Sequence, residues 1–158
     1  MEINILFDEG LEGCLDAAWV EGIVKQALIT QGIRGDVEMG LVIASQQRVQ
    51  ELNKTYRGKD KPTDVLSFAM LPEPAAGQEA IFATPPDGIT HLGEVIISYP
   101  QAVKQAEEHR HSIKREAAIL IIHGVLHLLG YDHIEPEPAS RMAAREAAIL
   151  EIVEGGLD

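Results

Sequence analysis

Two spacings of apolar residues alternate along the first part of the chain. Residues 2–7 (EINILF) and 37–44 (VEMGLVIA) are short segments rich in strand-forming residues, which predicts two β-strands. Between them, residues 16–31 carry apolar side chains at helical spacing, and Asp16 is placed to cap the first turn. The pattern therefore predicts a strand, a helix and a second strand in succession.

The alternation continues beyond residue 44. Ser45 is placed to cap a helix that runs to about Tyr56. Residues 65–70 (VLSFAM) and 92–98 (LGEVIIS) are short runs of strand formers, and Pro100 suits the first turn of a further helix. These segments add one helix and two strands to the prediction, followed by a helix that contains AVKQAEEH.

The longest helical pattern lies in the last third of the chain. Residues 113–129 (IKREAAILIIHGVLHLL) predict a mostly buried helix that ends at Gly130, and a last amphipathic helix is expected from about Pro138 through ASRMAAREAAILEIVE. Residues 71–90 hold four of the eight prolines, and we interpret them as a surface loop inserted between two strands. We therefore expect one α+β domain that spans residues 1–158.

Composition excludes some classes of protein. With 46% apolar and 24% charged residues, the chain can bury a core and is not expected to be disordered. Cys14 is the only cysteine, so a metal site must use other ligands and a reducing compartment is expected. The segment MEINILFDEG does not resemble a signal peptide, and no apolar run reaches the length of a membrane span. We expect a cytoplasmic protein without a membrane partner.

The net charge of −12 argues at first against nucleic acid as a partner. The distribution of charge matters more, because four of the thirteen Lys and Arg residues lie within residues 54–61 (KTYRGKDK). A second basic group, Arg110, Lys114 and Arg115, lies just upstream of the histidines at 123–133. Each group alone is ordinarily a solvated surface, so neither identifies a partner without further evidence.

Half of the six histidines lie in residues 123–133 (HGVLHLLGYDH). His123 and His127 are four residues apart on the predicted helix, so both side chains project from one face and can bind one metal ion. Gly130 lets the chain turn back, which brings His133 within reach as a third ligand. Three imidazoles leave a coordination position open, as in a catalytic zinc site. We expect one zinc ion per chain at these three residues.

The histidine spacing matches the zinc motif of metzincin peptidases, HExxHxxGxxH, except at one position. Peptidases have a glutamate after the first histidine, and it serves as the general base for peptide hydrolysis. This chain has Gly124 there. Three neutral imidazoles also leave the full charge of a divalent ion, which suits an anionic phosphodiester better than an amide. The motif therefore favours a metal-dependent reaction other than peptide hydrolysis.

Three blocks together resemble the YbeY family of bacterial metal-dependent endoribonucleases, which take part in ribosomal RNA maturation and ribosome quality control. The blocks are HGVLHLLGYDH, NKTYRGKDKPTDVLSF (53–68) and LGEVIIS. The resemblance implies a four-stranded mixed sheet with surrounding helices, zinc at His123, His127 and His133, and a functional arginine at Arg57. Two departures are visible: the family often has LGD where this chain has LGE, ending at Glu94, and FP where it has Phe68 and Ala69.

The predicted reaction is zinc-dependent cleavage of single-stranded RNA, with His123 and Arg57 as the catalytic residues. A guanidinium can hold a phosphate by two hydrogen bonds and stabilise charge that develops on its oxygens. Lys59 and Lys61 are expected to bind substrate, because they add a local positive field. The alternative, that both are ordinary solvated surface residues, is about as well supported by the sequence. The resemblance implies ribosomal RNA, the small ribosomal subunit and its assembly factors as partners.

Two alternatives remain open from the sequence. A metallopeptidase-like hydrolase could use the same ligands if another carboxylate, such as Glu94, supplied the base. A non-catalytic ribosome assembly factor could hold a structural zinc. The other histidines, His91, His109 and His111, are expected to be surface residues, and Asp132 is expected either to orient His133 or to lie in an exposed turn.

Overall fold

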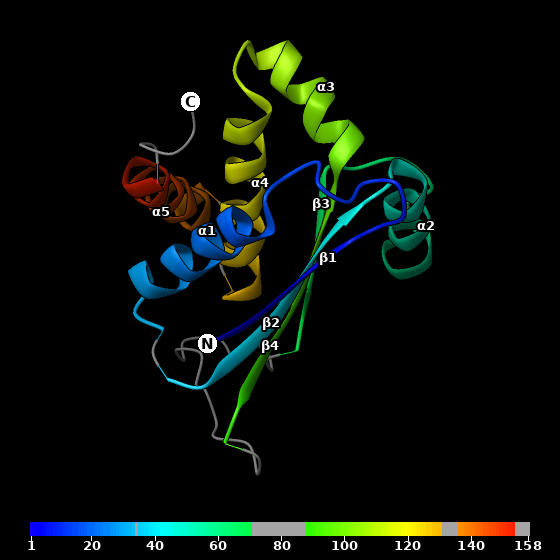
Figure 1. The fold of residues 1–158 in the computed structure, drawn as a ribbon. Coiled ribbons are helices and arrows are strands. Elements are labelled where there is room, and N and C mark those ends of the chain that lie inside the picture. Colours follow the sequence, from blue (N-terminus) through cyan, green and yellow to red (C-terminus); the bar gives the residue numbers. More distant parts are fainter. Residues whose placement is uncertain (34, 71–87, 131–135, 154–158) are drawn as a thin grey trace.

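The computed structural model describes residues 1–33, 35–70, 88–130 and 136–153. These residues form four strands and five helices (Figure 1), in the order β1 (Glu2–Phe7), α1 (Ala17–Thr30), β2 (Val37–Ala44), α2 (Gln46–Arg57), β3 (Val65–Ala69), β4 (Thr90–Ser98), α3 (Tyr99–His109), α4 (Ile113–Leu128) and α5 (Pro136–Val153). The predicted order of strands and helices is confirmed. Most of the predicted loop, residues 71–87, lies outside the described residues, and β4 begins at Thr90, two residues before the predicted start.

The four strands form one mixed sheet in the order β1-β2-β4-β3. β2 pairs in parallel with β1 and with β4, whereas β3 pairs antiparallel with β4 and forms an edge of the sheet. The α+β fold class and the four-stranded mixed sheet are therefore confirmed.

Side chains on the two faces of the sheet contact different helices. α1, α4 and α5 lie on one side of the sheet and α2 on the other (Figure 1). Val95 and Ile97 of β4 belong to the large core shared with α1 and α4, whereas Ile96 packs with Leu66 of β3 and Val49 of α2. Because successive strand residues point to opposite faces, each position of β3 and β4 can be assigned to the α4 side or the α2 side.

Short polar side chains start the helices where the sequence predicts them. The Asp16 side chain accepts hydrogen bonds from the backbone nitrogens of Ala18 (2.8 Å) and Trp19 (3.4 Å). Ser45 does the same for Arg48 at 3.2 Å, before α2. These bonds satisfy amide groups that have no partner within the helix, which fixes where each helix begins.

Gly93 allows β3 to approach β4 closely. Its φ is +129°, and a Cβ at this position would lie 2.1 Å from the carbonyl oxygen of Phe68. The register of β4 against β2 shifts beside it, between Glu38 and Met39. Only glycine fits this point of the sheet without displacing the edge strand.

Two findings bear on the expected cellular setting. Cys14 is a free thiol, and burial raises its pKa. Among the helices that the structure describes, none combines the length and the apolar character needed to cross a membrane.

Candidate functional site

The two histidines predicted to bind metal lie together on α4. Ser112 caps this helix by accepting a hydrogen bond from the Arg115 nitrogen at 3.1 Å, and His127 follows His123 by one turn. The Nε2 atoms of His123 and His127 are 3.0 Å apart. Zn–N distances of about 2.0–2.1 Å place ligand atoms of a tetrahedral site about 3.4 Å apart, so the pair fits one ion with a small adjustment.

A carboxylate on another helix holds the first imidazole. Glu146 of α5 lies with Oε1 at 2.7 Å from Nδ1 of His123. Hydrogen bonding at Nδ1 places the ring hydrogen there and leaves the Nε2 lone pair facing His127. The histidine–carboxylate arrangement of a metal site is therefore present, and the sequence analysis missed Glu146 because it lies 23 residues away on a different helix.

Gly124 lies where α4 packs tightly against the sheet. A Cβ at this position would lie 2.5 Å from Cγ1 of Val95 and 3.2 Å from Cγ2 of Val65. The Ser67 hydroxyl donates a hydrogen bond to the Gly124 carbonyl oxygen at 3.0 Å. The position that carries the general base in metzincins thus faces the sheet here, and packing leaves no room for a glutamate side chain.

A cavity of about 310 Å³ opens beside His123. Ile119 and Leu120 supply its apolar part, and its polar lining consists of Asp64, Gln105, Glu108, His109, Glu116 and His123. Asp64 accepts hydrogen bonds from the Val65 nitrogen (2.8 Å) and from Nε2 of Gln105 (3.3 Å). Among the residues that the structure describes, the lining includes three carboxyl groups and no lysine or arginine, so this lining attracts cations.

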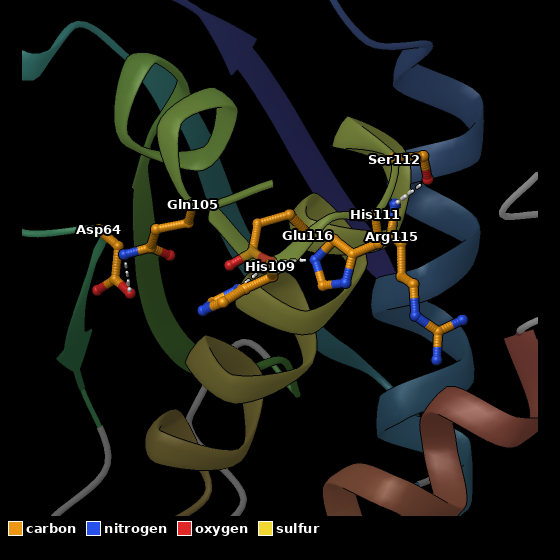
Figure 2. A network of polar contacts seen from close by, with 7 residues as sticks. All are labelled: Asp64, Gln105, His109, His111, Ser112, Arg115 and Glu116. Carbon is orange, nitrogen blue, oxygen red and sulfur yellow. Dashed lines mark hydrogen bonds and ion pairs between the residues drawn. The ribbon is translucent and has the colours of Figure 1, made fainter. Parts of the chain in front are cut away.

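A second group of metal-ligating side chains lies at the start of α4. His109, His111 and Glu116 bring their ligand atoms within 4.8 Å of one another and could hold a metal ion (Figure 2). Sequence reasoning treated both histidines as surface residues, and the structure corrects this for His111, whose side chain is only 21% exposed. The available signal was a glutamate five residues after His111, across the Ser112 cap.

The remaining predicted ligand cannot be placed. His133 and Asp132 lie outside the described residues. Among the predicted metal ligands, the structure therefore brings together His123 and His127, and the third ligand stays a prediction.

Arg57, Lys59 and Lys61 lie at and beyond the end of α2. Arg57 is the last residue of α2, and Gly58 ends the helix in a left-handed conformation (φ 69°). The exposed loop that follows carries both lysines and leads to Asp64, which lines the cavity beside His123. α2 packs on the face of the sheet opposite α4 (Figure 1).

Glu94 lies on the α2 side of the sheet. It precedes Val95, which faces α4, so the Glu94 side chain points to the other face. There it lies against Gly40 of β2, where an added Cβ would be 3.4 Å from Cγ of Glu94. This carboxylate is therefore on the opposite face from His123 and cannot supply the base of a peptidase site there.

Comparison with known proteins agrees with the geometry. The profile of the family described as "Endoribonuclease YbeY" matches residues 14–154. The chain belongs to the YbeY family. Membership of this family of endoribonucleases makes the chain a nuclease of the hydrolase class, and the resemblance seen in the sequence is confirmed.

Several YbeY proteins are similar in sequence to this chain over most of its length. Endoribonuclease YbeY of Dehalococcoides mccartyi strain CBDB1 is 47% identical over 148 residues, covering 92% of this chain and 89% of the relative. That of Moorella thermoacetica is 47% identical over 128 residues, covering 81% and 80%. A solution structure of a Thermotoga maritima protein matches with a TM-score of 0.62 at 28% identity, covering 97% of this chain and 89% of the other. The YbeY fold thus extends over nearly the whole chain.

Proposed function

We propose that this YbeY-family chain is a zinc-dependent endoribonuclease specific for single-stranded RNA. It acts in the cytoplasm on ribosomal RNA, with the small ribosomal subunit and its assembly factors as partners in RNA processing and ribosome quality control. The observation that carries the proposal is the convergence of two Nε2 atoms at 3.0 Å in a chain of an endoribonuclease family.

His123, His127 and His133 are the proposed ligands of one zinc ion. Two contacts support this proposal: the Nε2 atoms of His123 and His127 lie 3.0 Å apart, and Glu146 forms a hydrogen bond with Nδ1 of His123. A divalent ion held there supplies Lewis acidity toward a phosphodiester. The chain's own contribution is to fix the ring of His123 from the other side, through Glu146, before substrate arrives.

His123 and Arg57 are the proposed catalytic residues. Lys59 and Lys61 are proposed to bind the RNA backbone. The support is that Arg57 ends α2 and that both lysines lie on the exposed loop after it, which leads to Asp64 in the lining of the cavity beside His123. A flexible single strand can adapt to this loop and to the cavity more easily than a stiff duplex can, which favours the single-stranded substrate.

The test compares cleavage of a short unstructured RNA with cleavage of an unstructured peptide by the full chain. His127→Ala removes one proposed ligand, and His91→Ala is the matched control because His91 pairs with Glu38 on the sheet, away from α4. We expect RNA cleavage by the wild type and by His91→Ala, and a loss of at least a hundredfold in His127→Ala. Peptide cleavage would support the peptidase alternative, and zinc binding without cleavage of RNA would support a structural zinc.

A further inference from the structure

We propose that His109, His111 and Glu116 bind a second divalent transition-metal ion of the zinc class, separate from the ion proposed at His123 and His127. This site goes beyond the proposed function, because the cleavage reaction requires only the ion at the histidine pair. It would raise the metal content of the chain from one ion to two.

The three side chains come from two helices and the turn between them. His109 ends α3 and Glu116 lies in the first turn of α4. Arg110, between the two histidines, adopts a left-handed conformation with φ 57° and ψ 44°. This turn directs both imidazoles toward the same carboxylate, as Figure 2 shows.

Both imidazoles converge on one oxygen of Glu116. Nδ1 of His109 lies 3.1 Å from Oε2, and Nε2 of His111 contacts the same oxygen. The Glu116 side chain is only 3% exposed, so its position is fixed by the surrounding core. A neutral imidazole binds a metal through the nitrogen without hydrogen, so each ring needs only to move its hydrogen to its other nitrogen to change from donor to ligand.

The donor set determines which metal fits. Two imidazole nitrogens and one carboxylate oxygen are typical ligands of Zn²⁺ and its neighbours, whereas Ca²⁺ and Mg²⁺ require oxygen ligands. The His109 side chain is 56% exposed, and the ligand atoms of the three residues already lie within 4.8 Å of one another. His109 and Glu116 also line the cavity, which leaves room for water or another ligand.

Charge around the group also favours a cation. The cavity that His109 and Glu116 line contains two more carboxyl groups, Asp64 and Glu108. Two nearby basic side chains point elsewhere: Nζ of Lys114 lies 5.6 Å from the centre of the Trp19 ring, and Arg115 extends away from Glu116 in Figure 2. A metal ion is therefore the group that would balance the acidic lining.

The second ion would lie apart from the first. Glu116 and His123 are seven residues apart on α4, a rise of about 10 Å, and both line the same cavity. Two-metal catalytic centres hold their ions about 3.5–4 Å apart, so the ions would not share a ligand or a reacting oxygen. For the proposed function, the second charge would reduce the repulsion between an RNA phosphate and the carboxyl groups of the cavity.

The test measures binding of zinc alone to the metal-free full chain by calorimetry, with elemental analysis of the loaded protein. We expect two ions per chain in the wild type and in the control His91→Ala. His111→Ala should bind one ion, His127→Ala should bind one, and the combined variant none. His109→Ala, which alters a mostly exposed side chain and leaves the core intact, should weaken one of the two binding events at least tenfold.

The outcomes separate the two sites. One ion per wild-type chain that is lost in His127→Ala and unchanged in His109→Ala and His111→Ala would overturn the second site and leave the proposed catalytic site standing. One ion that is lost in His111→Ala and retained in His127→Ala would support the site at Glu116 and overturn the ligand assignment at the histidine pair. Circular dichroism of each variant shows whether it retains the helical content of the wild type.

Discussion

The carboxylate of Glu146 and the imidazole of His123 meet at 2.7 Å, between Oε1 and Nδ1, and join α5 to α4. This contact orients His123 so that Nε2 faces His127. A residue late in the chain thereby sets the geometry of the proposed metal site. The arrangement makes α5 part of the site as well as part of the core.

Replacing Glu146 should weaken zinc binding without unfolding the chain. In Glu146→Gln the amide oxygen can still accept a hydrogen bond, but the negative charge that favours a cation beside the ring is lost. We expect zinc affinity at the histidine pair to fall roughly ten- to a hundredfold, and further in Glu146→Ala. Competition with a chromophoric chelator measures this affinity. Glu151→Gln, an exposed residue on the same helix, is the control, and equal affinities of Glu146→Gln and Glu151→Gln would contradict the role of Glu146.

Gly124 and Gly22 should respond in opposite directions to the same substitution. Alanine is favoured over glycine in a helix by about 1 kcal/mol. At Gly22 of α1 an added Cβ meets nothing within 4 Å, so Gly22→Ala should raise the free energy of unfolding by about 0.5–1 kcal/mol. At Gly124 the Cβ would lie 2.5 Å from Val95, and overpacking of about 1–3 kcal/mol should outweigh the helix preference. Urea unfolding of the metal-free proteins measures both; stabilisation by Gly124→Ala would show that α4 can move away from the sheet.

Arg57→Lys should separate catalysis from binding of RNA. Arg57 is exposed at the end of α2, so the variant should fold and bind zinc as the wild type does. The positive charge remains, so we expect RNA affinity to fall by less than about threefold. The cleavage step should slow by tenfold or more, because a lysine cannot form the two parallel hydrogen bonds of a guanidinium.

Single-turnover cleavage and equilibrium binding of one short RNA provide the two numbers for this comparison. Lys54→Arg is the control, since Lys54 lies on the same helix, forms an ion pair with Asp60 at 3.8 Å and keeps its charge in the variant. Equal losses in rate and affinity for Arg57→Lys would assign Arg57 to docking of the RNA. No loss in either would make it an ordinary surface arginine.

The chain should not hydrolyse peptides at a useful rate. Gly124 has no room for a general base, and Glu94 lies on the opposite face of the sheet from His123. Positioned acid–base catalysis contributes about a hundredfold or more, which a peptidase site built here would lack. The measurement is metal-dependent release of a fluorophore from a mixed peptide library. Activity that survives Glu94→Gln and disappears in His127→Ala would contradict this account.

Local patterns in the sequence were sufficient to predict the helices and strands. Asp16 and Ser45 cap helices where the sequence places them, because a cap acts within three residues of itself. The pairing of His123 with His127 was predictable for the same reason, since residues four apart on a helix share a face. The four-stranded mixed sheet was expected from the family resemblance, but the order of its strands was not predicted, because periodicity does not determine which strands are neighbours.

Contacts between distant segments were not predictable in this way. Glu146 reaches His123 from another helix, and nothing near either residue in the sequence indicates the contact. The meeting of His109 and His111 at Glu116 depends on the left-handed turn at Arg110, a conformation that glycine adopts more readily than arginine. From the sequence, Gly124 could be understood only as the loss of the glutamate that serves as base in peptidases. The structure shows in addition that Gly124 packs closely against Val95.

The most direct test of the central claim is the rate of single-turnover RNA cleavage as zinc is added stepwise to the metal-free chain. The test uses His109→Ala, so that filling of the proposed second site does not complicate the titration. The account predicts a rate that rises from near zero and saturates when one equivalent is bound, and no rise when His127→Ala is added to the same background. Cleavage that is independent of zinc, or that saturates equally in the His127→Ala background, would contradict the claim that an ion at His123 and His127 is required for the reaction.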